Sequence, residues 1–427
     1  MPPLSTHKFN VLVVGGGPAG LIAAAALAHE GHQVTVLERQ PDLRTQGGML
    51  IIQPAAVRAL CHIGGAAEAL GQIAVPGDKF YWWSHGDDRP FASMATPPIS
   101  EIDRVQTDRP ALQRVGYNLA VDAGVFVLFG RKVVRVDDQK PAVWTEDGEE
   151  FQADMILGVD GIKSTIRRLI FPDKDVEPIP TRECIFHADV SIPSLVTDPL
   201  VADFLKPGAL HATLGPGKFA IGRQTTHNSF GMLCIDIDHG PPGPVNGAWN
   251  TPGDVGLLRE RFSKFNRPFR AFLEHVTECS KWQIANAAEL ETWRSPSGRV
   301  LLIGDAAHAM VPHAAQGVSQ GIEDGIAIAR LLRWARRPDD IPFISESFET
   351  LRRPRVDRFV KQSLENAAKH SLDDGPEQKA RDEGIREMSK RRITVDWKSI
   401  QPDKNANPPS PAFMIWVAGY NVMAEVS

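Results

Sequence analysis

The sequence predicts an α/β protein in which a Rossmann-like domain is interleaved with a domain built on an antiparallel sheet, followed by C-terminal helices. A buried strand, a glycine-rich turn, an Ala-rich helix and another buried strand follow one another between residues 10 and 37, the order of a βαβ unit with a parallel sheet. From 181 to 285, short alternating segments indicate an antiparallel sheet with one covered face. A length of 427 residues suits two joined domains.

Hydrophobic runs place the elements of the Rossmann-like domain in order. A helix at 18–29 separates strands at 10–14 and 34–37, and another helix begins at Arg109, where Pro110 suits the first turn. A strand at 125–128 comes next. A three-stranded antiparallel meander with a turn at Asp147-Gly148 then precedes the return to the buried sheet. The meander strands and that return are expected at 133–136, 142–145, near Phe151, and at 155–158.

The second half of the chain contains the antiparallel sheet and the long helices. A turn at 215–217 joins two of the sheet strands, and a helix is expected from 254 to 277. A buried strand at 299–303 then leads to a long helix at 317–337 with an apolar face. Charged residues at 370–393 and a Pro/Asn-rich stretch at 402–411 indicate solvated connections, the run from Asp373 to Arg392 being a solvated helix. The strands of this sheet are expected at 184–190, 209–214, 218–222 and 230–237.

These segments divide into two domains and a tail. The Rossmann-like domain is expected to be discontinuous, comprising 1–80, 104–180 and 286–370. The substrate domain is expected at 81–103 and 181–285, and the C-terminal helical segment and tail at 371–427.

Composition and charge exclude several classes of protein. A net charge of −5 without a long basic block gives nucleic-acid binding no electrostatic support. The four cysteines lie far apart and the histidines are scattered, so neither a metal site nor a disulfide framework is expected. No run reaches the roughly 18 apolar residues of a membrane span. We therefore expect a cytoplasmic monomer or homodimer.

The glycine-rich turn has the pattern Gly-x-Gly-x-x-Gly between a strand and a helix. Gly15 permits the tight turn, Gly17 lets the backbone approach a pyrophosphate, and Gly20 lets helix and strand pack closely. Glu38 ends the second strand 18 residues after Gly20, where a carboxylate accepts hydrogen bonds from ribose hydroxyls. Together these features predict a dinucleotide site, without separating FAD from NAD.

A second segment, some three hundred residues later, favours FAD over NAD. The strand at 299–303 ends in Gly304-Asp305, whose short carboxylate can bind a sugar-alcohol hydroxyl close to the backbone. A loop through Pro312 then leads to a long helix starting at Gln316-Gly317. The positive end of that helix favours the negative charge on a reduced flavin, and NAD has no counterpart that needs it.

The ordered motifs resemble those of the FAD-dependent aromatic hydroxylases, the group A flavoprotein monooxygenases that include salicylate hydroxylase and the tetracycline-inactivating enzymes. The similarity covers about residues 9 to 370, and 413–425 resembles the tail of fungal members. Besides the two glycine motifs, it rests on Asp160-Gly161, on Arg109 with Leu112, and on Gly47-Gly48 ahead of a helical stretch. The cofactor-binding residues expected are Gly15, Gly17, Pro18, Ala19, Gly20, Glu38, Arg39, Gly48, Arg109, Asp160, Gly304, Asp305, Pro312, Gln316, Gly317 and Val318.

The resemblance implies a reaction. NADPH or NADH reduces the FAD, O₂ adds at flavin C4a, and the hydroperoxide hydroxylates a phenolic or indolic small molecule, in secondary metabolism or xenobiotic breakdown. Asp160 and Arg167 fit the family's contacts with cofactor phosphate and nicotinamide. The chain has no second Gly-x-Gly-x-x-Gly, which agrees with transient docking of NAD(P)H.

Two positions depart from the family pattern. Ala315 stands where the family has glycine, and because alanine disfavours positive φ, we expect the loop to be shifted slightly. Ala55 stands where the family often has asparagine, which removes a polar group near the flavin.

The substrate side is less defined, and the catalytic residues are unknown. Arg223 could pair with a phenolate or carboxylate, and His211 or His313 could act as a base. We expect His308 to be structural, and the two adjacent tryptophans to face opposite ways. The wider set of candidates for substrate contact is His187, His211, Arg223, His227, Tyr81, Trp82 and Trp83.

Two other functions remain as alternatives. A flavin-dependent halogenase would carry Trp-x-Trp-x-Ile-Pro, which Tyr81-Trp-Trp83 does not match. A non-catalytic FAD-binding interaction protein would show no NAD(P)H oxidation with any aromatic ligand.

Overall fold

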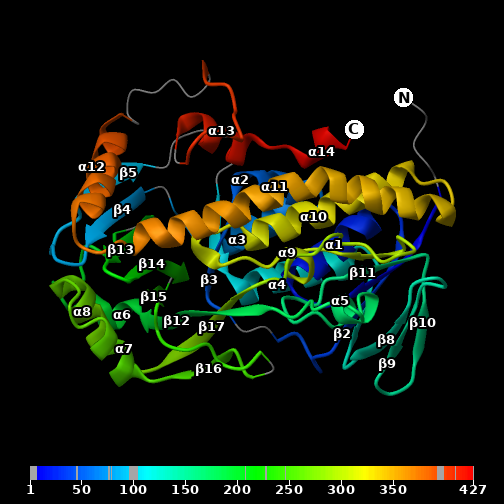
Figure 1. Cartoon of the computed structure of the whole chain (residues 1–427), viewed down its shortest axis with the longest axis horizontal. Coiled ribbons are helices and arrows are strands. Elements are labelled where there is room, and N and C mark those ends of the chain that lie inside the picture. Colours follow the sequence, from blue (N-terminus) through cyan, green and yellow to red (C-terminus); the bar gives the residue numbers. More distant parts are fainter. Residues whose placement is uncertain are drawn as a thin grey trace.

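The computed structural model describes residues 7–44, 47–75, 77, 79–95, 104–206, 208–226, 228–245, 247–391, 399–408 and 410–426. A five-stranded parallel sheet has the strand order β18-β11-β1-β2-β7, and the labels β2 and β11 mark its position in Figure 1. The predicted Rossmann-like class is thereby confirmed. The strands are β1 (Asn10–Val14), β2 (Gln33–Glu38), β7 (Phe126–Phe129), β11 (Met155–Gly158) and β18 (Val300–Leu302).

Helices pack against this sheet. Helix α1 (Pro18–His29) has the predicted bounds, and α4 (Arg109–Asp122) begins at the predicted Arg109. Asp108 caps α4 by accepting a hydrogen bond from Ala111 N at 2.8 Å.

The three-stranded antiparallel meander is confirmed. Its strands are β8 (Val133–Asp137), β9 (Ala142–Thr145) and β10 (Glu150–Gln152).

An eight-stranded sheet forms the second layer, in the order β16-β17-β12-β15-β14-β13-β4-β5. It is antiparallel except where β13 pairs with β4. One face packs on an aromatic-rich core under α6 (Ile192–Leu195), α7 (Val255–Arg261) and α8 (Arg267–Glu274), and the other face carries a smaller apolar cluster. The strands are β4 (Lys79–Ser84), β5 (Ala92–Ala95), β12 (Ile179–Ser191), β13 (Ala209–Gly215), β14 (Lys218–Thr226), β15 (Ser229–Asp236), β16 (Asn250–Gly253) and β17 (Cys279–Asn286).

Three predicted segments differ in the structure. The helix expected at 254–277 is two helices, because Asn266 caps a new one through Phe269 N, with Pro268 in its first turn. The helix expected at 317–337 ends at Leu331 and continues as a 3₁₀ turn. Gly48 leads first into strand β3 (Met49–Ile52), which pairs with β6 (Val105–Asp108), and only then into a helix.

The C-terminal third adds long helices beside the first domain. Figure 1 shows α10 (Gly317–Leu331) and α11 (Ile341–His370) side by side, with α12 (Pro376–Arg391) near β4 and β5. No helix in the described part of the chain is long and apolar enough to cross a membrane. The remaining helices are α2 (Pro54–Leu60), α3 (Ala66–Ile73), α5 (Thr165–Ile170), α9 (Asp305–His308), α13 (Pro411–Gly419) and α14 (Val422–Glu425).

Small residues allow α1 and α10 to approach closely. A Cβ on Gly325 would lie 2.8 Å from Ala23 Cα, and one on Gly321 would lie 3.0 Å from Ala19 Cβ. The glycines of α10 and the alanines of α1 each recur after four residues, so they face one another along both helices. This contact sets the N-terminus of α10 next to that of α1.

We predict that Gly325→Ala lowers the free energy of unfolding by about 1–3 kcal/mol, because the added methyl group meets backbone that cannot move away. Chemical denaturation measures the change. Gly71→Ala in α3 is the matched control, since its Cβ would meet nothing within 4 Å, and it should stabilise by about 0.5–1 kcal/mol. Equal effects of the two substitutions would contradict the proposed close contact.

Candidate active site

The glycine-rich turn has the geometry that its spacing predicts. Gly15 has φ +119°, and a Cβ there would lie 2.4 Å from Val159 O. A Cβ on Gly20 would lie 2.0 Å from Gly15 O, whereas one on Gly17 would meet nothing within 4 Å. Gly15 and Gly20 therefore permit close backbone packing, and Gly17 leaves open space at the N-terminus of α1.

Polar side chains hold this turn in place. Glu38 Oε2 accepts a hydrogen bond from Gly16 N at 2.6 Å, and Glu38 Oε1 accepts one from Gln40 N at 2.7 Å. Gln113 of α4 donates its amide N–H to Gly16 O at 2.7 Å. Sequence reasoning singled out Arg109 and Leu112 on this helix but missed Gln113, which lies four residues after Arg109 on the same face. Arg39 is exposed beyond the end of β2.

The second predicted segment, Gly304-Asp305, forms a turn beside α1, where a Cβ on Gly304 would lie 3.6 Å from Ala19 Cβ. Gly304 has φ +59°, and its N–H donates to Asp324 Oδ2 at 3.0 Å. The same oxygen lies 2.6 Å from His308 Nε2, and the His308 ring is buried against Trp293. This contact joins His308 to α10 beside the turn that carries Asp305, as a structural role for His308 requires.

A buried charge cluster supports that turn from behind. The guanidinium of Arg352, on α11, donates to Asp324 Oδ1 and to Glu323 Oε2, each at 2.8 Å. Arg355 donates to Glu323 Oε2 at 2.9 Å and lies over the ring of Tyr420, 3.9 Å from its centroid. These charges are almost wholly buried, and each has an opposite partner, which is the condition for keeping them inside a protein.

Both glycine segments open onto one cavity of about 1360 Å³. Neither α1 nor α10 has a side-chain cap at its N-terminus, so their first N–H groups are available to an anion or dipole. The space beside Gly17 and the two uncapped helix starts fit the pyrophosphate and ring of FAD. Of the expected cofactor residues, those lining the cavity are Gly17, Pro18, Ala19, Arg109, Gly304, Asp305, Pro312, Gln316, Gly317 and Val318.

The guanidinium of Arg223 lies in the cavity wall and bonds to backbone carbonyls. Its NH1 group donates to Gln224 O at 2.9 Å, and its NH2 group donates to Leu50 O at 2.7 Å and to Thr107 O at 2.6 Å. Burial lowers the pKa of Arg223 to about 10, so it stays protonated at neutral pH. Arg223 thus fastens β14 to strands β3 and β6 and also lines the cavity, and its pairing with a phenolate or carboxylate stays a prediction.

Asp160 and Arg167 also bond to the fold itself. Asp160 accepts hydrogen bonds from the Ser164 hydroxyl and from Thr165 N at the start of α5. Burial raises the pKa of Asp160, against these hydrogen bonds. Arg167 is fully buried and donates to the carbonyls of Val176 and Ala306, both at 2.9 Å. Both side chains therefore shape the loop after β11.

His211 lies on the face of the sheet that turns away from the cavity. It accepts a hydrogen bond from Trp83 Nε1 at 3.1 Å and stacks on Tyr81 at a centroid distance of 5.1 Å. Burial lowers the pKa of His211 to about 3, so its ring is neutral, and it is not placed to act as a base. Trp83 belongs to that core and Trp82 lines the cavity, which confirms that the two tryptophans face opposite ways.

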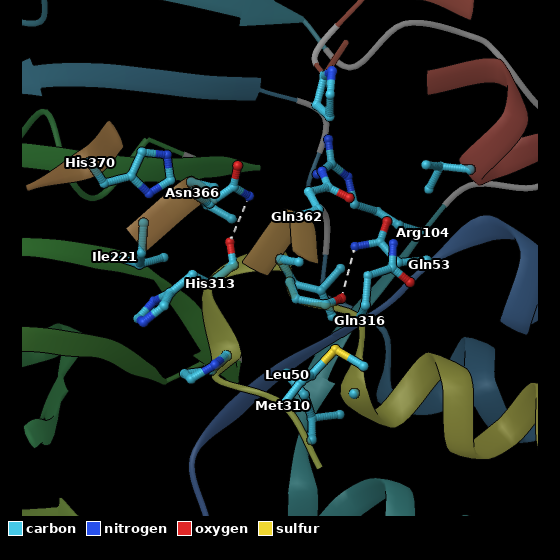
Figure 2. A pocket seen from close by; sticks show the side chains of 18 of the residues that line it. Leu50, Gln53, Arg104, Ile221, Met310, His313, Gln316, Gln362, Asn366 and His370 are labelled. Carbon is cyan, nitrogen blue, oxygen red and sulfur yellow. Dashed lines mark hydrogen bonds between the residues drawn. The ribbon is translucent and has the colours of Figure 1, made fainter. Parts of the chain in front are cut away.

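The remaining histidine candidates have different surroundings. His187 packs against Gly48, where a Cβ would lie 2.3 Å from its Nε2, and it pairs with Asp189 at 3.2 Å. His227 lies outside the described residues. Of the three catalytic candidates, His313 alone presents a side chain that lines the cavity without being committed to backbone carbonyls. Its Nε2 lies 3.0 Å from Glu183 Oε2. Figure 2 shows His313 in the cavity wall, where its backbone carbonyl accepts a hydrogen bond from Asn366.

Ala315, which stands where the resembling family has glycine, adopts the left-handed conformation. It has φ 49° and ψ 43°, and among the described residues it is the one non-glycine with positive φ. Its carbonyl accepts a hydrogen bond from Gln53 Nε2 at 3.1 Å. The alanine therefore takes the strained geometry of a glycine in this loop.

Helix α12 and the end of α11 were missed as parts of the site. The charge of the segment from Asp373 to Arg392 predicts a solvated helix, and the segment is helical from Pro376 to Arg391. One face nevertheless lines the cavity with Gly384, Ile385 and Met388. Their i, i+1, i+4 spacing within a charged stretch was the available signal.

Comparisons with known proteins agree with this geometry. A family model described as FAD binding domain matches residues 8–177 and 269–363. The FAD-dependent monooxygenase OpS4 of Beauveria bassiana (strain ARSEF 2860) is 26% identical over 431 residues, covering 98% of this chain and 96% of that protein. A salicylate hydroxylase of Pseudomonas putida is 26% identical over 386 residues, covering 85% and 86%. The crystal structure of CtdE in complex with FAD and substrate 4 superimposes with a TM-score of 0.81 at 20% identity, covering 98% and 97%.

We predict that Ala315→Gly stabilises the protein. Glycine removes about 1–2 kcal/mol of left-handed strain from the folded state. Its greater backbone freedom stabilises the unfolded state by about 0.5–1 kcal/mol. The free energy of unfolding should therefore rise by up to about 1 kcal/mol. The neighbouring Ala314→Gly has no such strain to relieve and should destabilise. Denaturant titration compares the two, and equal losses would refute the strained conformation.

Proposed function

The chain belongs to the FAD binding domain family and is an FAD-dependent monooxygenase, and from this premise we propose that it uses NADPH or NADH and O₂ to hydroxylate a phenolic or indolic small molecule. The observation that carries the proposal is the convergence of two uncapped helix N-termini on one cavity whose far wall is an apolar sheet face. Such a cavity has both a charge-stabilising side for a flavin and an apolar side for an aromatic ring.

The chain's own residues would hold FAD at three places. The N–H groups after Gly17 would bind the pyrophosphate, and Asp305 would accept hydrogen bonds from ribityl hydroxyls. The N-terminus of α10, at Gly317 and Val318, would stabilise negative charge on the ring. Arg109 would contact the cofactor beside Gly47, where a Cβ would lie 2.8 Å from Arg109 Cδ.

Bound FAD supplies the hard chemistry, which is acceptance of a hydride from NAD(P)H and activation of O₂ for transfer to the substrate. The protein positions the substrate and excludes water with the apolar side chains of the eight-stranded sheet. His313 would accept a proton from a phenolic hydroxyl. When its Nε2 donates to Glu183, its Nδ1 is an acceptor, because Glu183 fixes the tautomer of the ring.

We predict that an aromatic ligand of this class stimulates NAD(P)H oxidation by the FAD-loaded protein. Oxygen-atom insertion should appear as a product heavier by one oxygen, measured by mass spectrometry alongside NAD(P)H and peroxide. Halogenated product with halide present would favour the halogenase alternative. If FAD is bound but no phenolic or indolic ligand stimulates NAD(P)H oxidation, the result would contradict a monooxygenase and favour a binding protein.

We predict that Asp305→Ala purifies without FAD, because the carboxylate is the expected ribityl partner in the cavity wall. Flavin absorbance per chain measures occupancy. Asp122→Ala, at the exposed end of α4, removes a carboxylate far from this turn and should stay fully loaded. A yellow, fully loaded Asp305→Ala protein would refute the placement.

A further inference from the structure

Helix α11 holds the loop that precedes α10 through two of its side chains. The Ser363 hydroxyl donates to Val311 O, and Asn366 Nδ2 donates to His313 O at 3.0 Å. Because the two side chains are three positions apart, they lie on the same face of the helix. The amide of Asn366 is therefore fixed between α11 and the loop, in the wall of the cavity (Figure 2).

This contact determines which end of the Asn366 amide is left for a ligand. A carbonyl oxygen accepts hydrogen bonds and cannot donate one, so the amide atom that meets His313 O has to be the nitrogen. The oxygen, Oδ1, is then turned away from the loop, as Figure 2 shows. It accepts no hydrogen bond from the described part of the chain, and Asn366 is only half-buried. A ligand in the cavity can therefore reach this acceptor.

Gln53 holds the same loop in a similar way, but nearer to α10. Its Nε2 donates to Ala315 O at 3.1 Å, and its backbone N–H donates to the Ser319 hydroxyl on α10 at 3.0 Å. Gln53 thus lies at the helix start where the flavin ring is expected. Asn366 bonds two residues earlier in the loop, on the side of His370 (Figure 2). Its oxygen is therefore placed for a substrate and not for the cofactor.

An aromatic wall stands beside Asn366. The ring of Phe219 contacts the rings of His313 and His370 edge-on, at centroid distances of 5.2 and 5.1 Å. Ile221 lines the cavity next to them (Figure 2). His370 follows Asn366 by one helical turn, and burial lowers its pKa to about 3, so this neighbour is neutral. A ring that packs on this wall can present a hydroxyl or N–H at its edge to Asn366 Oδ1.

Charged side chains of α11 and α12 line the cavity as well. Two are positive and two are negative: Lys369, Arg381, Glu377 and Glu387. Arg381 donates to Asp382 Oδ1 and to Lys369 O, each at 2.8 Å, so its guanidinium does not occupy Asn366 Oδ1. An anionic group on a ligand would be attracted by the cations and repelled by the amide oxygen. Asn366 Oδ1 therefore recognises a different group, a neutral hydroxyl or N–H.

We propose that Asn366 determines specificity, because its Oδ1 accepts a hydrogen bond from a hydroxyl or N–H at the edge of the substrate's aromatic ring. This rests on the proposed monooxygenase function, since it assigns one residue to the phenolic or indolic substrate of that function. The two ends of the amide act separately: Nδ2 holds the loop before α10, and Oδ1 orients the ring. A substrate whose donor is methylated loses the second contact.

Ligand binding to the FAD-loaded full chain tests the proposal without requiring turnover. The probes are two matched pairs, indole with 1-methylindole and 2-naphthol with 2-methoxynaphthalene. Within each pair the ring system is the same, and the methyl group removes the donor. Perturbation of flavin absorbance measures each Kd. The Kd of the methylated probe divided by that of its unmethylated partner, the methylation ratio, reports the hydrogen bond.

Variants of α11 assign the hydrogen bond to the Asn366 oxygen. Asn366→Leu should lower the methylation ratio by about 2- to 10-fold, because only the unmethylated probe loses a partner. Asn366→Asp keeps an acceptor oxygen in either protonation state and should keep the ratio. If Asn366→Leu does not retain FAD, Asn366→Ala carries the same expectation.

Ser363→Ala is the matched control. It removes the other side-chain tie between α11 and the loop but no group that lines the cavity. A loosened loop changes the binding of both members of a pair alike, so Ser363→Ala should leave the methylation ratio unchanged. A merely structural role of Asn366 would make its variants behave in the same way.

The outcomes separate this inference from the function on which it rests. An unchanged ratio in Asn366→Leu, an equal fall in Ser363→Ala, or no binding of either unmethylated probe would overturn the role of Asn366. Stimulated NAD(P)H oxidation by other aromatics would still support the monooxygenase in those cases. A ratio that falls in Asn366→Leu alone, without stimulated oxidation by any ligand, would support the acceptor and overturn the monooxygenase.

Discussion

The buried contact between Arg352 and the carboxylates of Glu323 and Asp324 is the constraint on which the site depends. It ties α11 to α10. Asp324 also accepts a hydrogen bond from the backbone N–H of Gly304, which fixes the turn before Asp305. Burial alone would raise the pKa of Asp324, but His308 and Arg352 outweigh it and lower the pKa to about 2. The resulting stability is present above pH 3.8, the ordinary value, and is lost as pH falls towards 2. Removing one partner of such a cluster costs about 3–5 kcal/mol, because the other charge is left buried.

The cavity depends equally on contacts between the two sheets. Arg223 connects β14 to the carbonyls of Leu50 and Thr107, so the wall that would face a substrate is fastened to the strands beside the expected flavin. Gln53 extends this attachment to the loop before α10 through Ala315 O. Arg223, which the sequence suggests as a partner for an anionic substrate, thus holds two layers of the protein together.

Much of the fold and the cofactor side of the site could be predicted, because local sequence determines them. The turn at Gly15–Gly20 and the strand ending at Gly304-Asp305 are short motifs whose backbone geometry demands glycine. The place of His211 in the aromatic core could not be predicted, since side-chain orientation on a strand depends on which face the tertiary structure covers. The cavity face of α12 was missed because Ile385 and Met388 are few among charged neighbours.

The close contact of α1 with α10 joins residues separated by about three hundred positions in the chain. During synthesis the first βαβ unit leaves the ribosome long before Gly321 and Gly325 exist. The early segment can form its glycine turn, but the wall that contains Asp305 and the second helix N-terminus must wait for the last third of the chain. A cofactor held by both helix N-termini would therefore require synthesis at least as far as Gly325.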